Sequence, residues 1–154
     1  MEGIIQIRQM RPSDVDALLV LEEESLEAAA WTRQAYEDLL SNPGRNCCLV
    51  AEIDGEVVGF ACFRTVDREA ELLNLMVLPQ YRRIGVGTHL FERIVVDLRE
   101  SWVRDVYLEV RHSNIPAMGF YRHFGFEMSG RRPAYYPNPP EDALTFRLRL
   151  SEAD

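Results

Sequence analysis

The sequence predicts a mixed α/β (α+β) domain in which helices flank one central, mainly antiparallel sheet. Strand-like and helix-like segments follow one another in the order β-α-α-β-β-β-α-β-α-β-β. Asp54-Gly55 stands between two apolar runs and is a strong signal of an antiparallel hairpin. Late in the chain a strand, a helix and a strand follow one another, which favours one parallel strand pair. The 154 residues suffice for one core, so residues 1–154 are expected to form a single domain.

The first half is expected to contain two helices between strands. Residues 4–8 suggest a first strand, and Ser13 is the expected N-cap of a helix that continues to Glu22-Glu23-Glu24. Thr32 is the expected cap of a second, shorter helix that ends near Leu40. Three strands are then predicted, over residues 47–53, 57–64 and 70–77.

The second half alternates helices and strands. A helix is predicted over residues 87–100, because apolar residues recur there at helical spacing. Residues 106–111 alternate apolar with polar side chains, which indicates a strand with two different faces. Gly125 is expected to end a helix over residues 116–124. The last strands are predicted at 126–131 and 144–150, around a proline-rich loop at 133–140.

Composition restricts the class of protein. The net charge of −8 disfavours a protein that grips nucleic-acid backbones, and it favours neutral or basic partners. No apolar run approaches the length of a membrane span, and the first residues do not resemble a secretory signal. Three cysteines lie in apolar surroundings without a histidine at ligand spacing. A disulfide framework and a metal site are therefore not expected, and the reducing cytoplasm is the expected location.

One motif is suited to phosphate. Arg82-Arg83-Ile84-Gly85-Val86-Gly87-Thr88 lies between an expected strand and an expected helix. Its glycines let the backbone approach a ligand closely, and the start of a helix favours an anion. A pyrophosphate is the predicted ligand, although the run is neither a dinucleotide fingerprint nor a Walker loop. The alternative is an ordinary helix entrance with solvated arginines.

Three polar residues follow that motif along the chain. Glu109 lies on the strand face opposite Val106, Leu108 and Val110. It either faces water or is held in a cleft, where a carboxylate can act as a general base. Tyr121 lies on the apolar stripe of the next helix, and Asn114 precedes that helix. Each has an ordinary structural role, core packing for Tyr121 and capping for Asn114, yet the topology would bring all three beside the glycine-rich turn.

Taken together, these motifs resemble those of the GNAT N-acetyltransferases. Arg82-x-x-Gly85-x-Gly87 is similar to the acyl-CoA-binding signature of that family. The resemblance continues through Leu108-Glu109-Val110-Arg111-x-Ser113-Asn114, Tyr121, Gly125-Phe126 and Arg131-Arg132-x-x-Tyr135-Tyr136-Pro137. Over residues 71–150 it is similar to the bacterial branch that acetylates the N-terminal alanine of a small-subunit ribosomal protein.

The resemblance implies acetyl-CoA as the acetyl donor, with no metal. It places the pantetheine arm along the backbone of Leu75, Met76 and Val77, with the Val77 N–H near the thioester carbonyl. Asn114 is implied to hydrogen-bond the same arm. The pyrophosphate would contact the turn formed by Arg82, Arg83, Ile84, Gly85, Val86, Gly87 and Thr88.

The resemblance also implies the roles of catalytic and acceptor-binding residues. Glu109 is the implied base for the acceptor amine, and Tyr121 the implied acid for the departing thiolate. Trp31, Tyr135 and Tyr136 would line the peptide entrance. Amine and thioester would react directly in a ternary complex. A cysteine acyl carrier is disfavoured because the three cysteines have no neighbouring histidine.

The acceptor is expected to be a peptide or protein N-terminus. Glu22-Glu23-Glu24 and Glu141-Asp142 would form an acidic rim beside the entrance, which would favour a basic peptide. Acetylation of lysine or a small amine stays an alternative, although the paired tyrosines favour a peptide. A non-catalytic acyl-CoA-binding module is the remaining alternative, and the presence of both Glu109 and Tyr121 disfavours it. The sequence does not indicate an oligomeric state.

Overall fold

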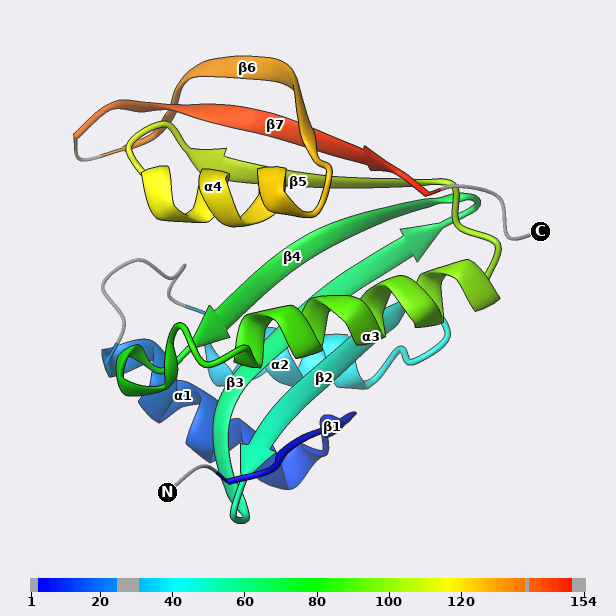
Figure 1. Ribbon diagram of the computed structural model, residues 1–154, viewed down its shortest axis with the longest axis vertical. Coiled ribbons are helices and arrows are strands. Elements are labelled where there is room, and N and C mark those ends of the chain that lie inside the picture. The colour runs from blue at the N-terminus through cyan, green and yellow to red at the C-terminus, as the bar shows by residue number, and fades with distance from the viewer. Residues whose placement is uncertain (1–2, 25–30, 138, 151–154) are drawn as a thin grey trace.

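The computed structural model describes residues 3–24, 31–137 and 139–150. These residues form a seven-stranded sheet in the order β1-β2-β3-β4-β5-β7-β6 (Figure 1). β4 and β5 run parallel, whereas the other neighbouring strands run antiparallel. α3 covers one face of β2–β4, and α1 and α2 lie behind the opposite face. The predicted mixed sheet and its single parallel pair are therefore confirmed.

The elements follow the predicted order, with ends that shift by a few residues. The first half contains β1 (Ile5–Gln9), the 3₁₀ turn η1 (Pro12–Asp14), α1 (Val15–Glu24), α2 (Arg33–Leu40), β2 (Asn46–Ile53), β3 (Glu56–Val66) and β4 (Glu69–Val77). The second half contains the 3₁₀ turn η2 (Pro79–Tyr81), α3 (Val86–Glu100), β5 (Asp105–Arg111), α4 (Ile115–His123), β6 (Glu127–Tyr136) and β7 (Glu141–Arg149).

Local signals position several element ends as predicted. The Thr32 hydroxyl oxygen accepts the Ala35 N–H at 3.2 Å and caps α2. The Asn114 side-chain oxygen accepts the Ala117 N–H at 3.2 Å and caps α4. Asp54 and Gly55 both have positive φ, at 52° and 79°, as the predicted tight hairpin requires. These features depend on neighbouring residues alone, which is why the sequence predicts them.

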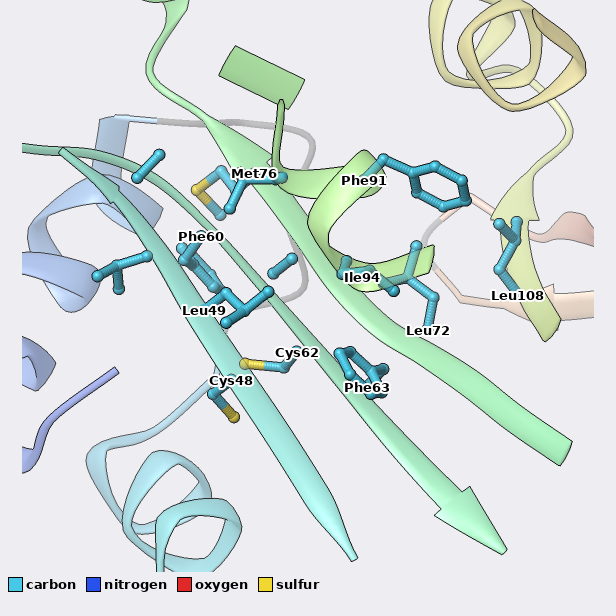
Figure 2. Packing of buried hydrophobic residues seen from close by; sticks show 14 of the residues in the cluster. Cys48, Leu49, Phe60, Cys62, Phe63, Leu72, Met76, Phe91, Ile94 and Leu108 are labelled. Atoms are coloured by element: carbon cyan, nitrogen blue, oxygen red, sulfur yellow. The ribbon is translucent and has the colours of Figure 1, made fainter. Parts of the chain in front are cut away.

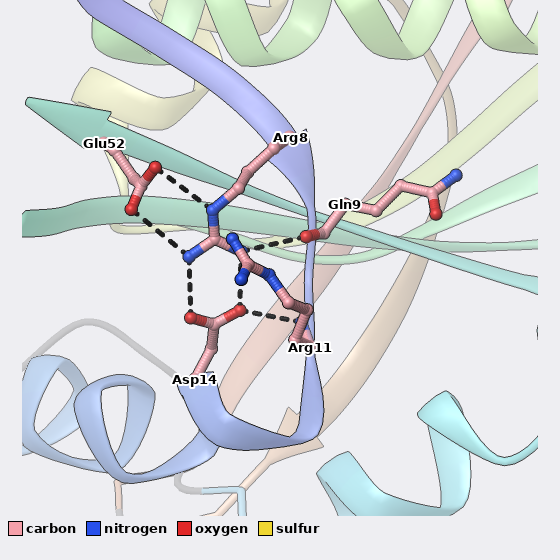
Figure 3. A network of polar contacts seen from close by, with 5 residues as sticks. All are labelled: Arg8, Gln9, Arg11, Asp14 and Glu52. Carbon is pink, nitrogen blue, oxygen red and sulfur yellow. Dashed lines mark hydrogen bonds and ion pairs between the residues drawn. The ribbon is translucent and has the colours of Figure 1, made fainter. Parts of the chain in front are cut away.

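The predicted Ser13 cap is wrong, because the helical turn η1 begins before Ser13, with Arg11 as its N-cap and Asp14 as the residue that accepts the Arg11 N–H (Figure 3). The Asp14 carboxylate accepts the Arg11 N–H at 2.7 Å and two Arg8 hydrogen bonds at 2.8 Å each. Arg8 also pairs with Glu52 of β2 at 3.1 Å. Hydrogen bonds from Arg8 lower the pKa of Asp14, so this buried carboxylate stays charged. The network joins β1, η1 and β2.

The core lies on both faces of the central strands. Figure 2 shows Phe91 and Ile94 of α3 on the same side of the sheet as Leu72. On the opposite face Phe60 packs against the fully buried Tyr36 of α2, with 5.8 Å between ring centres. Both faces are apolar, which explains why β2 and β3 read as nearly continuous apolar runs.

β4 and β5 separate after a short paired stretch. They pair only where Glu69, Ala70 and Glu71 lie opposite Asp105, Val106 and Tyr107. Leu73 is then an extra residue in β4, because Leu72 lies opposite Phe63 and Asn74 lies opposite Cys62. Such a bulge bends its strand. Among the described residues, Leu72 and residues 74–77 of β4 therefore pair with β3 but not with β5, and the strands diverge in Figure 1.

The predicted loop over residues 133–140 is wrong in part. β6 continues to Tyr136, which pairs with Glu141 of β7, so Tyr135 and Tyr136 lie in a strand. Residue 138 lies outside the described residues. Pro133 is tolerated because β6 is at the edge of the sheet, where a missing N–H costs no ladder hydrogen bond. None of the described helices combines the length and apolar character that crossing a membrane requires.

Candidate active site

The glycine-rich turn lies between η2 and the first residues of α3, where the sequence predicts it. Gly85 is the N-cap of α3 with φ of 93°, and Arg83 has φ of 66°. Left-handed residues of this kind turn successive N–H groups toward one anion. The Arg82 side chain donates to the Val77 carbonyl at 3.2 Å and ties the turn to the end of β4. The turn and the start of α3 are therefore suited to a phosphate ligand.

The end of β4 offers an edge to an extended ligand. Leu75, Met76 and Val77 pair with β3 on one side. In the described residues β5 does not pair with them on the other side. Backbone N–H and C=O groups on such an edge can pair with a chain that carries amides. The Val77 carbonyl, at the end of this edge, accepts a hydrogen bond from the Arg82 side chain. An extended ligand along the edge would therefore reach the glycine-rich turn.

Glu109 lies at the point where β4 and β5 separate. Its strand has the predicted two faces, with Val106, Leu108 and Val110 buried and Glu109 partly exposed. Glu109 lines a pocket of about 290 Å³. Its side chain is 22% exposed, and its Oε1 lies 3.1 Å from Nη2 of Arg132. The carboxylate is thus held in place but can be reached from solvent. The pocket is lined by Arg64, Val66, Glu69, Ala70, Glu71, Tyr107, Leu108, Glu109, Arg132 and Thr145.

Tyr121 is buried, with 9% of its surface exposed. Its ring packs edge-on against Phe120 and Phe126, with ring centres 5.5 and 5.6 Å apart. Burial raises the pKa of Tyr121, so the phenol keeps its proton at neutral pH. Asn114 caps the same helix through its side-chain oxygen. The cap uses only that oxygen, so the amide group of Asn114 can still donate to a ligand.

Trp31 lines a second pocket of about 310 Å³. Its ring packs edge-on against Tyr36, with 5.3 Å between ring centres. Glu22 accepts both the Tyr36 hydroxyl at 2.6 Å and the Trp31 N–H at 3.3 Å. Arg64 lines this pocket and the Glu109 pocket, so the two adjoin. The second pocket is lined by Trp31, Ala35, Asp38, Leu39, Asn46, Arg64 and Leu73.

Tyr136 lies close to the catalytic candidate Glu109. Burial raises the pKa of Tyr136, and the negative charge of Glu109 raises it further. The Arg111 guanidinium lies 4.2 Å from the centre of the Tyr136 ring. Tyr135 packs edge-on against Tyr136 and is 51% exposed. The structure therefore brings both tyrosines to the Glu109 side of the site.

Most acids of the predicted acidic rim have partners within the chain, and the rim itself stays a prediction. Glu22 is engaged by Tyr36 and Trp31. Glu141 pairs with Arg111, and Asp142 pairs with Arg131. The Glu24 side chain lies outside the described residues. The acids that line the Glu109 pocket are Glu69, Glu71 and Glu109 itself.

Sequence reasoning missed two arginines of the site. Arg64 reaches the pocket only because β3 and β4 pair it with Glu71, and no local motif indicates this. Arg132 stands in the run that carries the family resemblance, but its contact with Glu109 depends on the packing of β6 beside β7 and β5. Both contacts are long-range in sequence.

Comparison with known proteins identifies the family. The family model described as "Acetyltransferase (GNAT) family" matches residues 13–126. The chain belongs to this family. The predicted enzyme class, a GNAT-type N-acetyltransferase, is thereby confirmed, and the family uses acetyl-CoA as its acyl donor.

Curated relatives cover nearly the whole chain. The putative [ribosomal protein bS18]-alanine N-acetyltransferase of Bacillus subtilis is 36% identical, over 95% of this chain and 96% of its own. The [ribosomal protein bS18]-alanine N-acetyltransferase of Escherichia coli is 32% identical, over 94% and 97%. The crystal structure of the ribosomal-protein-S18-alanine N-acetyltransferase from Escherichia coli has a TM-score of 0.87 at 30% identity, over 98% and 97% of the chains. The predicted fold is therefore confirmed.

Proposed function

We propose that this chain is an acetyl-CoA-dependent Nα-acetyltransferase whose acceptor is the N-terminal alanine of a small-subunit ribosomal protein. The observation that carries the proposal is the reachable Glu109 carboxylate, in a pocket that opens where the free edge of β4 begins. The printed names of the relatives from Bacillus subtilis and Escherichia coli support this acceptor. Ribosomal proteins are made in the cytoplasm, so the proposal also places the chain there.

The donor site fits the described geometry. We assign the pyrophosphate to the turn from Arg82 to Thr88, because left-handed Gly85 and the start of α3 direct N–H groups toward an anion. The pantetheine arm is assigned to the backbone of Leu75, Met76 and Val77, and to the amide group of Asn114. When bound, acetyl-CoA supplies the acetyl group as a thioester.

Glu109 and Tyr121 have complementary proton-transfer roles in this proposal. An N-terminal amine has a pKa near 8 and is mostly protonated at neutral pH, so it cannot attack. Glu109 removes this proton directly or through water, a contribution of about 10²–10⁴-fold. The Val77 N–H stabilises negative charge that develops on the thioester oxygen. Tyr121, kept protonated by burial, donates its proton to the departing thiolate.

The acceptor is held by aromatic side chains on both sides of Glu109. Trp31 contributes from just before the Thr32 cap of α2, and Tyr135 and Tyr136 contribute from the end of β6. Because amine and thioester are held together, transfer is direct and needs no covalent intermediate on the protein. Glu69 and Glu71 favour an acceptor that carries positive charge.

The test uses three acceptors with acetyl-CoA. One is a peptide with the N-terminal sequence of bS18, one is the same peptide with a blocked N-terminus and an internal lysine, and one is a small amine. Thiol release gives the rate, and tandem mass spectrometry locates the acetyl group. We expect acetylation of the free N-terminus at a much higher kcat/KM. Preference for lysine or the small amine would contradict the acceptor, and binding of acetyl-CoA without turnover would contradict catalysis.

A further inference from the structure

Glu109 has a cationic partner within the chain. Nη2 of Arg132 lies 3.1 Å from Oε1 of Glu109, and both side chains line the same pocket. Arg132 comes from β6, at the edge of the sheet, whereas Glu109 lies on β5. The Arg132 side chain is 59% exposed and that of Glu109 is 22% exposed. The pair is therefore open to solvent on the arginine side.

The remaining charged and titratable groups that face Glu109 come from several strands. Arg64 of β3, Glu69 and Glu71 of β4, and Tyr107 of β5 line the pocket. Tyr136 of β6 responds to the charge of Glu109. Arg111 is occupied by Glu141 and by the Tyr136 ring. Within the described residues, Arg132 is the cation that forms an ion pair with Glu109.

An acceptor ammonium must reach the same carboxylate. A base acts on a proton that lies within about 3 Å, directly or through one water. At 3.1 Å the Arg132 guanidinium occupies part of the same hydrogen-bonding shell. Guanidinium and ammonium are both donors that favour an ionised carboxylate, so they compete for Glu109.

Arg132 makes a second contact while it pairs with Glu109. Its guanidinium carbon lies 5.5 Å from the centre of the Tyr135 ring, where a cation is stabilised. The register of β6 against β7 is irregular between Arg132 and Tyr136, so the backbone there is less constrained by ladder hydrogen bonds. An exposed pair of this kind is weak. Arg132 can therefore leave Glu109 at little cost.

We propose that Arg132 is a positioning residue: it is the counter-ion of Glu109 in the free enzyme, and the acceptor's ammonium displaces it. This proposal rests on the proposed function, because it requires Glu109 to receive the acceptor amine. Arg132 holds the carboxylate in a fixed orientation before the acceptor arrives. It also raises KM, because every acceptor must displace it.

The test compares Arg132→Gln, Arg132→Lys and Arg131→Gln with the parent enzyme. Arg131 is the matched control, because it is the preceding residue of β6 and pairs with Asp142 rather than with Glu109. Steady-state kinetics use the bS18 N-terminal peptide at saturating acetyl-CoA. For Arg132→Gln we expect KM for the peptide to fall about two- to fivefold, with kcat within about twofold of the parent.

The split between KM and kcat separates this role from a structural one. A cation that only competes with the acceptor for Glu109 changes KM and leaves kcat nearly unchanged. Arg132→Lys should restore the parent's KM, and Arg131→Gln should leave KM unchanged.

The outcomes that overturn the proposal are distinct. An unchanged or higher KM in Arg132→Gln, or a kcat that falls together with KM, overturns the role of Arg132 while leaving the proposed function intact. An equal change of KM in Arg131→Gln also overturns the role of Arg132, because the change would then report the stability of β6. A parent enzyme that acetylates no peptide N-terminus overturns both proposals.

Discussion

Replacing Gly59 with alanine should destabilise the protein, because the added methyl group lacks room. Gly59 lies in β3 opposite Val77 of β4. A Cβ at this position would lie 2.8 Å from the Met76 carbonyl oxygen and 3.2 Å from a methyl group of Val86. The first contact is with backbone, which cannot rotate away. β3 and β4 must therefore move apart where the pantetheine arm is proposed to bind.

The size of the effect follows from two opposing terms. Overpacking a well-packed interior costs about 1–3 kcal/mol. Alanine restricts the unfolded chain more than glycine does, which offsets about 0.4–1 kcal/mol. We expect the free energy of unfolding to fall by roughly 1–2 kcal/mol. In a chain of 154 residues, 1 kcal/mol shifts Tm by about 2–4 °C, so Tm should fall by roughly 2–8 °C.

Urea unfolding followed by circular dichroism measures this change, and two other glycines are the controls. At Gly130, a strand residue, a Cβ would lie 3.8 Å from its nearest neighbour, so alanine should be nearly neutral. At Gly119 in α4, a Cβ would meet nothing within 4 Å, and alanine should stabilise by about 0.5–1 kcal/mol. Acetyl-CoA affinity should fall in Gly59→Ala alone. Equal stability of Gly59→Ala and Gly130→Ala would refute the steric reasoning.

Four further predictions concern the site and the core. Gly85→Val should weaken acetyl-CoA binding at least tenfold, about 1.4 kcal/mol, because a β-branched residue cannot adopt φ of 93° without strain; unchanged affinity in calorimetry would contradict this placement. Glu109→Gln should lower kcat strongly and leave the Kd of acetyl-CoA nearly unchanged, and a parent-like rate would make Glu109 a structural residue. Asp14→Asn should cost about 1–3 kcal/mol at neutral pH, because Arg8 loses one of its two charged partners and keeps only Glu52. Arg8 lowers the pKa of Asp14 in the folded protein, so the stabilisation by Asp14 is fully present above its unfolded pKa near 4 and is lost as pH falls through its lower folded pKa. The unfolding free energies of the parent and of Asp14→Asn should therefore converge in acid. An arginine-rich peptide should have a higher kcat/KM than an acidic peptide, because Glu69 and Glu71 line the pocket, and the difference should shrink at high salt. Equal kcat/KM values for the two peptides would contradict an electrostatic preference.

The sequence by itself determined the order of elements, the hairpin at Asp54-Gly55 and the caps at Thr32 and Asn114. Each depends on side chains and backbone within a few residues, so a short window carries the whole signal. The left-handed Gly85 at the start of α3 is another local feature, and it places the glycine-rich turn correctly. Motif spacing along one strand and the next helix also predicts that Glu109, Asn114 and Tyr121 lie beside that turn, and this stays a prediction.

Only the tertiary structure decided how the site opens and which charges act in it. The extra residue Leu73 bends β4 away from β5, and its position depends on the pairing with β3. The edge position of β6 lets the strand run through Pro133 to Tyr136, where the sequence favoured a loop. Partners distant in sequence engage Glu22, Glu141 and Asp142 and bring Arg132 to Glu109. Charge contacts of this kind depend on which strands become neighbours, and local residue patterns do not encode that choice.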